Sequence, residues 1–230
     1  RLLDWPTSQM PDVIHAGYQA LMVMAMEAGA EIGGWLGDRQ MQSECRGALR
    51  RLRRHVPDHL RNKQAAAMLV LAGLADPGKV CRTVIARGGA EGFSTFYGYY
   101  MLEALAEGGL YDEALQIISD YWGAMLDLGA TTFWEDLNYA HAAGAARIDE
   151  PVPAGKFDIH AESGAYCYKG LRHSLCHGWA SGPTPWLSRH VLGIVPLEPG
   201  CKSVAVRPHL GHLKWAEGTF PTPWGVIRVR

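Results

Sequence analysis

Residues 111–136 read YDEALQIISDYWGAMLDLGATTFWED. Apolar residues recur at helical spacing over 111–128, and Gly129 stands where a helix with this spacing would end. The stretch that follows places two adjacent carboxylates, Glu135 and Asp136, beside two aromatic rings. Aromatic rings pack on the apolar faces of sugars, and carboxylates move the protons of glycosidic cleavage. The segment therefore indicates a helical protein whose sugar chemistry sits where a helix ends.

The chain upstream of this segment predicts paired helices. Apolar spacing and Gly, Asp or Pro breaks give five further helices, over about 11–34, 38–55, 63–73, 79–87 and 94–107. A last helix is predicted over 173–193, bent near Pro183 and Pro185. About seven helices make three αα-hairpins and leave one further helix. The pattern is that of an open half of a six-hairpin toroid, which would leave a large apolar face exposed.

The residue pattern changes from helical spacing to alternation after Pro196. Alternating residues predict strands over 203–207, 215–218 and 226–229, with 221–225 as a hairpin turn. Residues 145–172 lack periodicity and predict a long loop crossing the mouth of the helical domain. The fold class is therefore mainly α: a partial six-hairpin α/α toroid, or barrel, over 1–195, followed by a short antiparallel β segment over 196–230 that begins a second domain. Three short strands do not readily make an independent sandwich, so they must lean on other parts of the protein.

Composition excludes several classes of function. The 230 residues are 48% hydrophobic and carry a formal net charge of -1, so neither nucleic acid nor an anionic membrane is an expected partner. The basic run 50–55 lacks an aromatic or glycine platform and is interpreted as a solvated helix face. The sequence has no stretch of 18 uncharged apolar residues.

The five cysteines are odd in number and scattered, with no CxxC pair and no HExxH, so neither a metal nor a cofactor is expected. Unpaired cysteines are typical of a reducing compartment, which favours a cytoplasmic location. The chain begins with Arg1 rather than Met, so a piece of a longer protein is expected and the location of the parent stays open.

Residue types alone leave the role of Glu135 open. Thr131 or Thr132 could cap a helix with Glu135 at its third position, which is the pattern of a capping box. His177, in Ser-Leu-Cys-His-Gly-Trp, is by default a packed and hydrogen-bonded histidine. By default the tryptophans are core residues, and Asp136 is an orienting or solvated neighbour of Glu135.

Several segments together resemble the C-terminal half of the α-L-rhamnosidases of glycoside hydrolase family 78. The two specific ones are Gly-Ala-Thr-Thr-Phe-Trp-Glu over 129–135 and Ser-Leu-Cys-His-Gly-Trp over 174–179. Shorter pieces of the pattern are Asp-Trp at 4–5, Asn-Lys-Gln at 62–64, Gly-Phe-Ser-Thr at 92–95 and Gly-Thr-Phe-Pro-Thr-Pro-Trp-Gly at 218–225. The resemblance spans nearly the whole chain.

The resemblance implies an inverting hydrolysis of terminal, non-reducing α-L-rhamnose in which Glu135 is the general base. It further implies that His177 binds a sugar hydroxyl, that Trp134 and Trp179 line the pocket, and that Asp4 and Trp5 contact the sugar. In this family the general acid lies upstream, in the first half of the barrel, and no acidic residue here matches that motif. The expected partners are thus a rhamnose-containing glycoside or polysaccharide and the missing half of the barrel or a partner chain, and the isolated chain is expected to be inactive.

Three other readings stay open at the level of sequence. A degenerate barrel segment would bind sugar without catalysis. A helical interaction module would use Glu135 only as a cap. A polysaccharide lyase with the same α/α-barrel helices would use His177 and Tyr166 or Tyr168 as its proton-transfer pair.

Overall fold

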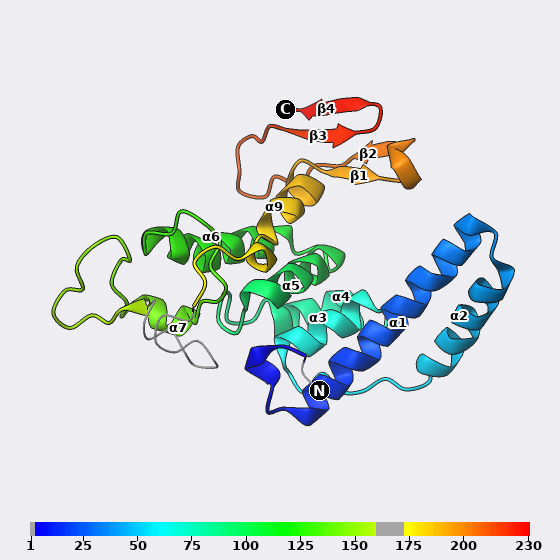
Figure 1. The fold of residues 1–230 in the computed structure, drawn as a ribbon, viewed down its shortest axis with the longest axis horizontal. Helices are drawn as coiled ribbons and strands as arrows, with labels where there is room; N and C mark the ends of the chain where they lie inside the picture. Colours follow the sequence, from blue (N-terminus) through cyan, green and yellow to red (C-terminus); the bar gives the residue numbers. More distant parts are fainter. Residues whose placement is uncertain (1–2, 160–172) are drawn as a thin grey trace.

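Three helical hairpins follow one another in a computed structural model that describes residues 3–159 and 173–230 (Figure 1). The hairpins are α1 (Pro11–Leu36) with α2 (Arg39–Leu52), α3 (Lys63–Leu71) with α4 (Pro77–Val80) and its continuation η2 (Cys81–Ile85), and α5 (Thr95–Glu107) with α6 (Tyr111–Asp127). The first member of each hairpin packs on the first member of the next, α1 on α3 and α3 on α5. The predicted hairpins are confirmed, with boundaries within a few residues of the expected ones.

Side-chain caps explain where these helices begin. Asp38, Asn62 and Asp76 each accept a hydrogen bond from a backbone N–H in the first turn of the helix that follows. The predicted stop after α6 is also present: Gly129 has a φ of 93°, a left-handed conformation that favours glycine.

The core lies between the three hairpins. Every residue from Gln64 to Val70 of α3 is buried, because this helix is packed on both sides by α1 and α5. Helix α6 approaches α5 closely at Gly98, where an added Cβ would lie 2.7 Å from the Trp122 ring. Trp186, also fully buried, donates from its indole N–H to the carbonyl of Leu102 at 3.0 Å. The central helix α5 is thus locked to both α6 and the C-terminal part of the chain.

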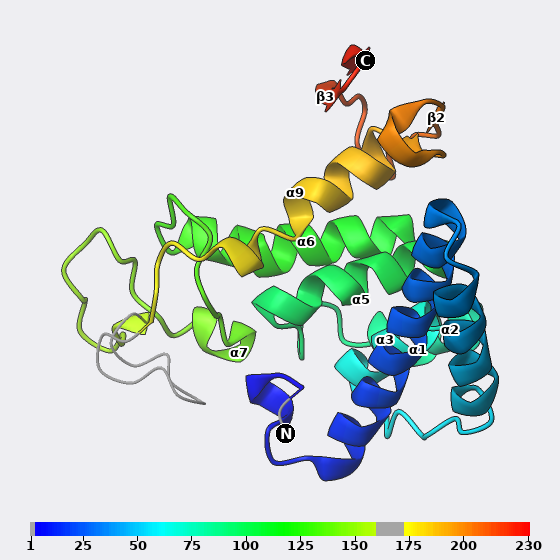
Figure 2. The same cartoon turned by 45° about the vertical axis from the view of Figure 1, so that its right-hand side comes forward.

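The stretch between α6 and the C-terminal strands is mostly irregular. It contains the short helix α7 (Tyr139–Ala142), which the sequence did not predict, and a loop over 143–159 whose only pairing is an isolated bridge between Ala145 and Phe157. Figures 1 and 2 show this loop extending away from the hairpins rather than across them. The rest of the predicted loop, residues 160–172, lies outside the described residues.

The last helix is shorter than expected. It begins at Pro183 as α9 (Pro183–Trp186) and continues as η4 (Leu187–Val191), while 173–182 holds only the single turn η3 (Gly178–Ala180). The expected helix over 173–182 is wrong. Its backbone groups instead bond to residues 133–135, and proline at position 183 favours the first turn of a helix.

Two small antiparallel sheets end the chain, at the opposite end of the molecule from the N-terminus in both views (Figures 1 and 2). One pairs β1 (Ile194–Pro196) with β2 (Val204–Val206), and the other pairs β3 (Gly218–Thr222) with β4 (Gly225–Val229). Strand β1 was not predicted, and 215–217 is not a strand; the turn lies at 223–224 rather than over 221–225. The predicted fold class, mainly α with part of a helical barrel and a short antiparallel β segment, is confirmed, whereas the division into domains at residue 195 stays a prediction.

The helical body exposes apolar side chains on its first hairpin. Met22, Ile32, Trp35 and Leu36 of α1 are 48%, 41%, 60% and 75% exposed. All four of these large apolar side chains belong to one helix. Among the described residues, no helix combines the length and the apolar character needed to span a bilayer.

We expect α5 to carry much of the stability of this body. Replacing the fully buried Leu102 by alanine removes apolar contacts and leaves a cavity, so the free energy of unfolding should fall by about 2–5 kcal/mol in urea denaturation. Leu126 of α6 is 66% exposed, and the matched change Leu126→Ala should cost less than about 0.5 kcal/mol. Equal losses for the two variants would contradict the packing described above.

Candidate functional site

Two irregular segments, 133–136 and 173–177, lie against each other and build the site. The Glu135 N–H donates to the Ser174 carbonyl at 2.9 Å, and the His177 N–H donates to the Phe133 carbonyl at 2.8 Å. The Thr132 hydroxyl adds a hydrogen bond to the Leu175 carbonyl. The two motifs singled out by sequence, far apart along the chain, are therefore held together by backbone hydrogen bonds.

The Glu135 carboxylate is partly enclosed at this junction. Its Oε2 accepts the Ser174 N–H at 3.0 Å and lies 3.9 Å from Nδ1 of His177. Its side chain is 15% exposed, and Oε1 receives no hydrogen bond from the described residues. Residues 131–137 are not helical, so the alternative in which Glu135 belongs to a capping box is wrong. Within the described part of the chain, the protein thus fixes Oε2 of this carboxylate and not Oε1.

The backbone of Glu135 is fixed as firmly as its side chain. Its carbonyl accepts hydrogen bonds from the Thr95 hydroxyl, at the start of α5, and from the Trp179 indole N–H at 2.8 Å. The Trp179 ring lies 4.4 Å from the His177 ring and 5.6 Å from the Phe96 ring, measured between centroids. Trp179 and Phe96 are each 36% exposed. They offer an aromatic surface next to Glu135 of the kind that sugars pack against.

Below this surface, a buried carboxylate ties three segments of the chain together. Asp4 precedes the short helix η1 (Trp5–Thr7), which leads into α1. Its Oδ2 accepts hydrogen bonds from Gln64 Nε2 of α3 and from the Ser94 hydroxyl at the start of α5, both at 2.9 Å, and its Oδ1 accepts the Trp5 N–H at 2.8 Å. Burial raises the pKa of Asp4, and the hydrogen bonds from Ser94, Trp5 and Gln64 oppose that rise.

Asp136 is the second buried carboxyl of the site. Its backbone N–H donates to Nε2 of His173 at 3.0 Å, and the residue as a whole is 7% exposed. Burial raises the pKa of Asp136 to about 7; the Leu137 N–H opposes this, and the charges of Asp4 and Glu135 add to it. Its Oδ2 is buried and has no hydrogen-bond partner among the described residues. Asp136 therefore lies inside the protein and is not the solvated neighbour that the sequence allowed.

The structure separates the predicted tryptophans. Trp179 borders Glu135 directly, and Trp5 is 37% exposed beside the Asp4 network. Trp134 is fully buried, packs edge-on against His173 at 6.2 Å and leaves its indole N–H without a described partner. Its side chain supports the segment from within, and its expected contact with the sugar stays a prediction.

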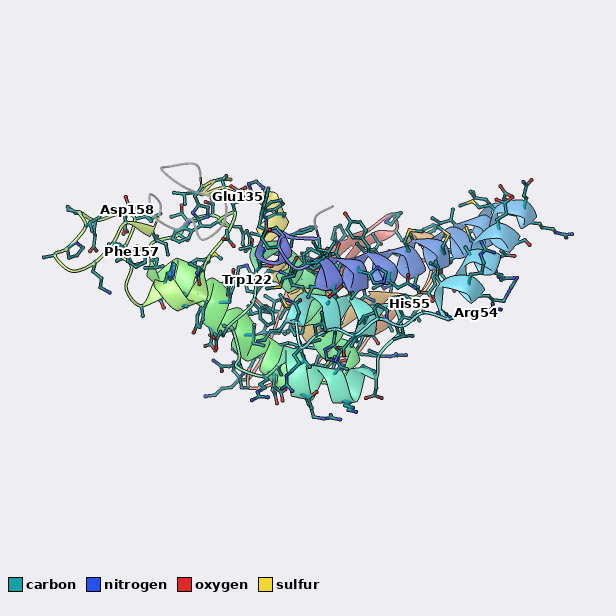
Figure 3. The ribbon with its side chains drawn as sticks, turned by 90° about the horizontal axis from the view of Figure 1, so that it is seen from below. Arg54, His55, Trp122, Glu135, Phe157 and Asp158 are labelled. Carbon is teal, nitrogen blue, oxygen red and sulfur yellow. The ribbon has the colours of Figure 1, made fainter. Side chains whose placement is uncertain are left out.

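An apolar groove of about 460 Å³ adjoins the junction. Phe133, His177 and Gly178 form the side nearest Glu135, and Trp122, Met125 and Leu126 of α6 form the other. Figure 3 places Trp122 and Glu135 in the same part of the molecule and Arg54 and His55 at the other end. The basic run is exposed, as expected of a solvated helix face, and is remote from the site.

Two further expectations concern the proton partners of a lyase and a metal site. Tyr166 and Tyr168, the proton partners of a lyase reading, lie outside the described residues. Within 3–159 and 173–230, no group of three His, Cys, Asp or Glu side chains could hold a metal ion.

Sequence reasoning gave no role to several residues that build the site. Gln64, Ser94 and Thr95 fall inside short pieces of the recognised pattern, and buried polar side chains at the starts of consecutive helices are a signal of a shared network. Their joint action depends on the packing of α1, α3 and α5, which no local pattern reveals.

Comparisons with known proteins support the resemblance at two levels. Residues 193–230 match the family model described as the bacterial alpha-L-rhamnosidase C-terminal domain. The fold matches the crystal structure of a GH78 family rhamnosidase of Bacillus sp. GL1, with a TM-score of 0.66 and 20% sequence identity. That match covers 90% of this chain and 22% of the Bacillus chain, so the present chain spans about a fifth of that protein. No curated protein matches the chain.

The resemblance to the family 78 rhamnosidases is thereby confirmed, in the C-terminal residues by sequence and over most of the chain by fold. It relates the chain to glycosidases. The individual site residues are not tested by these comparisons and stay predictions.

We expect the Asp4 network to be important for stability. In Ser94→Ala, Oδ2 of a buried carboxylate loses a donor, so the free energy of unfolding should fall by about 1–3 kcal/mol. The matched change Ser188→Ala removes a hydroxyl that bonds to the Thr184 carbonyl at the surface and should cost less than about 0.5 kcal/mol. A loss at position 94 no larger than that at 188 would contradict the role of the network.

Stability should depend on pH through Asp136. Its pKa is about 7 in the folded chain and 3.8 as an isolated group, so the folded state holds the proton more tightly. The stabilisation from this proton is complete below about pH 4 and is lost as pH rises through about 7, at about 1.4 kcal/mol per pKa unit. Urea denaturation of wild type and Asp136→Asn between pH 4 and 8 should show a fall in wild type that the variant lacks in large part; parallel curves would contradict this assignment.

Proposed function

We propose that this chain supplies the general base, Glu135, to an inverting glycosidase that removes terminal α-L-rhamnose residues. The observation that carries the proposal is the junction of the two specific motifs, where Ser174 fixes Glu135 Oε2 and Oε1 accepts no hydrogen bond from the described residues. A general base needs such an arrangement, because the carboxylate must be both oriented and open to water. The relationship to family 78 supplies the reaction class and the sugar.

In this mechanism Glu135 removes a proton from a water molecule that attacks the anomeric carbon. Attack comes from the face opposite the leaving group, so the configuration inverts. The Ser174 N–H stabilises the charged form of the carboxylate, and the His177 ring beside it can bond to a sugar hydroxyl. A general acid on the other face, about 6.5–9.5 Å from the base, protonates the leaving oxygen.

The general acid belongs to residues outside this chain in our proposal. None of the acidic residues here matches the family's acid motif, and the chain spans 22% of the Bacillus rhamnosidase whose fold it shares. The apolar residues exposed on α1, among them Met22, Trp35 and Leu36, fit a surface covered by the other half of the barrel. The substrate would then bind between the two halves, with Glu135 on this side.

Sugar binding would rest on the exposed aromatic rings and on His177. Trp179, with Phe96 behind it, can stack on the apolar face of a sugar next to the base. Trp5 is exposed enough to add a second contact. Asp4 has both oxygens engaged by protein donors, so its part is to hold the floor of the site, and direct contact with a sugar would require displacing one of them.

A non-catalytic sugar-binding segment is the second candidate. The absence of a matching general acid from this sequence favours it, because the aromatic surface and His177 could bind sugar without turnover. Loss of the base would then leave binding unchanged and have no activity to remove.

The decisive experiment compares wild type and Glu135→Gln in the longer protein that contains this chain, by nitrophenol release from an aryl α-L-rhamnoside. General-base catalysis predicts a loss of about 10²-fold or more with the fold intact. The control is Glu31→Gln, an exposed carboxylate of α1, which should retain full activity.

Three outcomes separate the candidates. Unchanged turnover in Glu135→Gln would place the base elsewhere. No turnover by the wild-type protein on a panel of glycosides would favour sugar binding alone or a lyase. Full turnover by the isolated 230 residues would contradict the proposal that the acid lies outside them.

A further inference from the structure

The segment that carries Glu135 has two faces. Phe133 and Glu135 are partly exposed, whereas Trp134 and Asp136 are buried. Asp136 therefore lies inside the protein, while the neighbouring Glu135 keeps part of its side chain exposed. There it joins the buried floor formed by Asp4, whose charge acts on it.

Among the described residues, the charges that act on Asp136 are negative, because Asp4 and Glu135 are both carboxyls. Nε2 of His173 accepts a hydrogen bond from the Asp136 backbone N–H. Within the described part of the chain Asp136 forms no ion pair, and His177 lies beside Glu135.

The hydrogen bonds of the floor point to the same conclusion. Oδ2 of Asp136 and Oε1 of Gln64 are both buried acceptors without a donor among the described residues. A charged carboxylate at Asp136 would receive the Leu137 N–H but no donor at Oδ2 from the described residues, whereas a carboxylic acid brings a donor of its own. Asp4 shows the contrast, because three protein donors surround its carboxylate.

We propose that Asp136 is a positioning residue for Glu135, held as an uncharged carboxylic acid in the floor of the site. Because Asp136 keeps its proton, it adds no second negative charge beside that of Asp4. Ionisation would add a negative charge next to Asp4 and Glu135 in a buried place, and repulsion would displace the segment on which the Glu135 carboxylate is mounted. The importance of this for catalysis rests on the proposed function, but the protonation and its effect on the segment do not.

Trp179 offers a direct reporter of the segment. Its indole N–H donates to the Glu135 carbonyl, one residue from Asp136. The experiment is to record the indole N–H resonances of the 230-residue chain by NMR between pH 5 and 9, with Trp179 assigned by Trp179→Phe. The wild type should show a change in the Trp179 shift with a midpoint near pH 7, the pKa of Asp136. Asp136→Asn, which keeps a donor and cannot ionise, should lack it.

A control removes the nearest alternative. The His177 ring lies 4.4 Å from Trp179 and could itself change the shift on titration. His177→Gln should keep the wild-type midpoint; loss of the transition in this variant, with retention in Asp136→Asn, would overturn the proposal.

A second measurement does not depend on any variant folding. The carboxyl ¹³C shift of Asp136 in the wild-type chain should titrate near pH 7. Titration near 4, the value of a free aspartate, would overturn the proposal. Because neither readout involves turnover, the outcome is separate from that of the rhamnoside assay.

Discussion

The arrangement of the site depends on the hydrogen bonds that the Asp4 carboxylate accepts. By bonding to Gln64 and Ser94, it joins the entry to α1 with the starts of α3 and α5. Thr95, the next residue along from Ser94, holds the carbonyl of Glu135. A buried ionic hydrogen-bond network therefore fixes the register between three helices and, one residue further on, the position of the proposed base. Networks of this kind are sensitive, because a lost partner leaves a buried charge short of donors.

Glu135 itself lies on an irregular segment, and this fits its proposed task. A helix would leave its side chain on one regular surface, whereas in this irregular segment Glu135 is partly exposed and Trp134 is buried. Four hydrogen bonds replace the rigidity that a helix would give. Glu135 accepts three of them, from Thr95, Trp179 and the Ser174 N–H, and donates the fourth from its N–H to the Ser174 carbonyl. The carboxylate is thus oriented without being closed off from water.

The local part of this architecture could be read from the sequence. Helical spacing and Gly, Asp or Pro breaks predicted the hairpins, and the family resemblance placed the two motifs at one pocket. The helix expected over 173–182 failed because its backbone bonds to residues 133–135, a tertiary interaction that overrides local propensity. The burial of Asp136 could not be predicted, since the sequence does not show which side chains of this irregular segment the rest of the protein covers.

The two buried carboxyls show how one floor can accommodate groups that water would otherwise solvate. Asp4 receives hydrogen bonds that favour its charged form, and its pKa is still raised because burial outweighs them. Asp136 has fewer donors, and its pKa rises to about 7. The protonated form avoids the repulsion that a second negative charge beside Asp4 would cause. Placing Asp136 next to Glu135 in sequence gives the two carboxyls opposite environments, one dry and one open to solvent. A single irregular segment can therefore carry an acid that keeps its proton and, one residue away, a carboxylate that is free to take one.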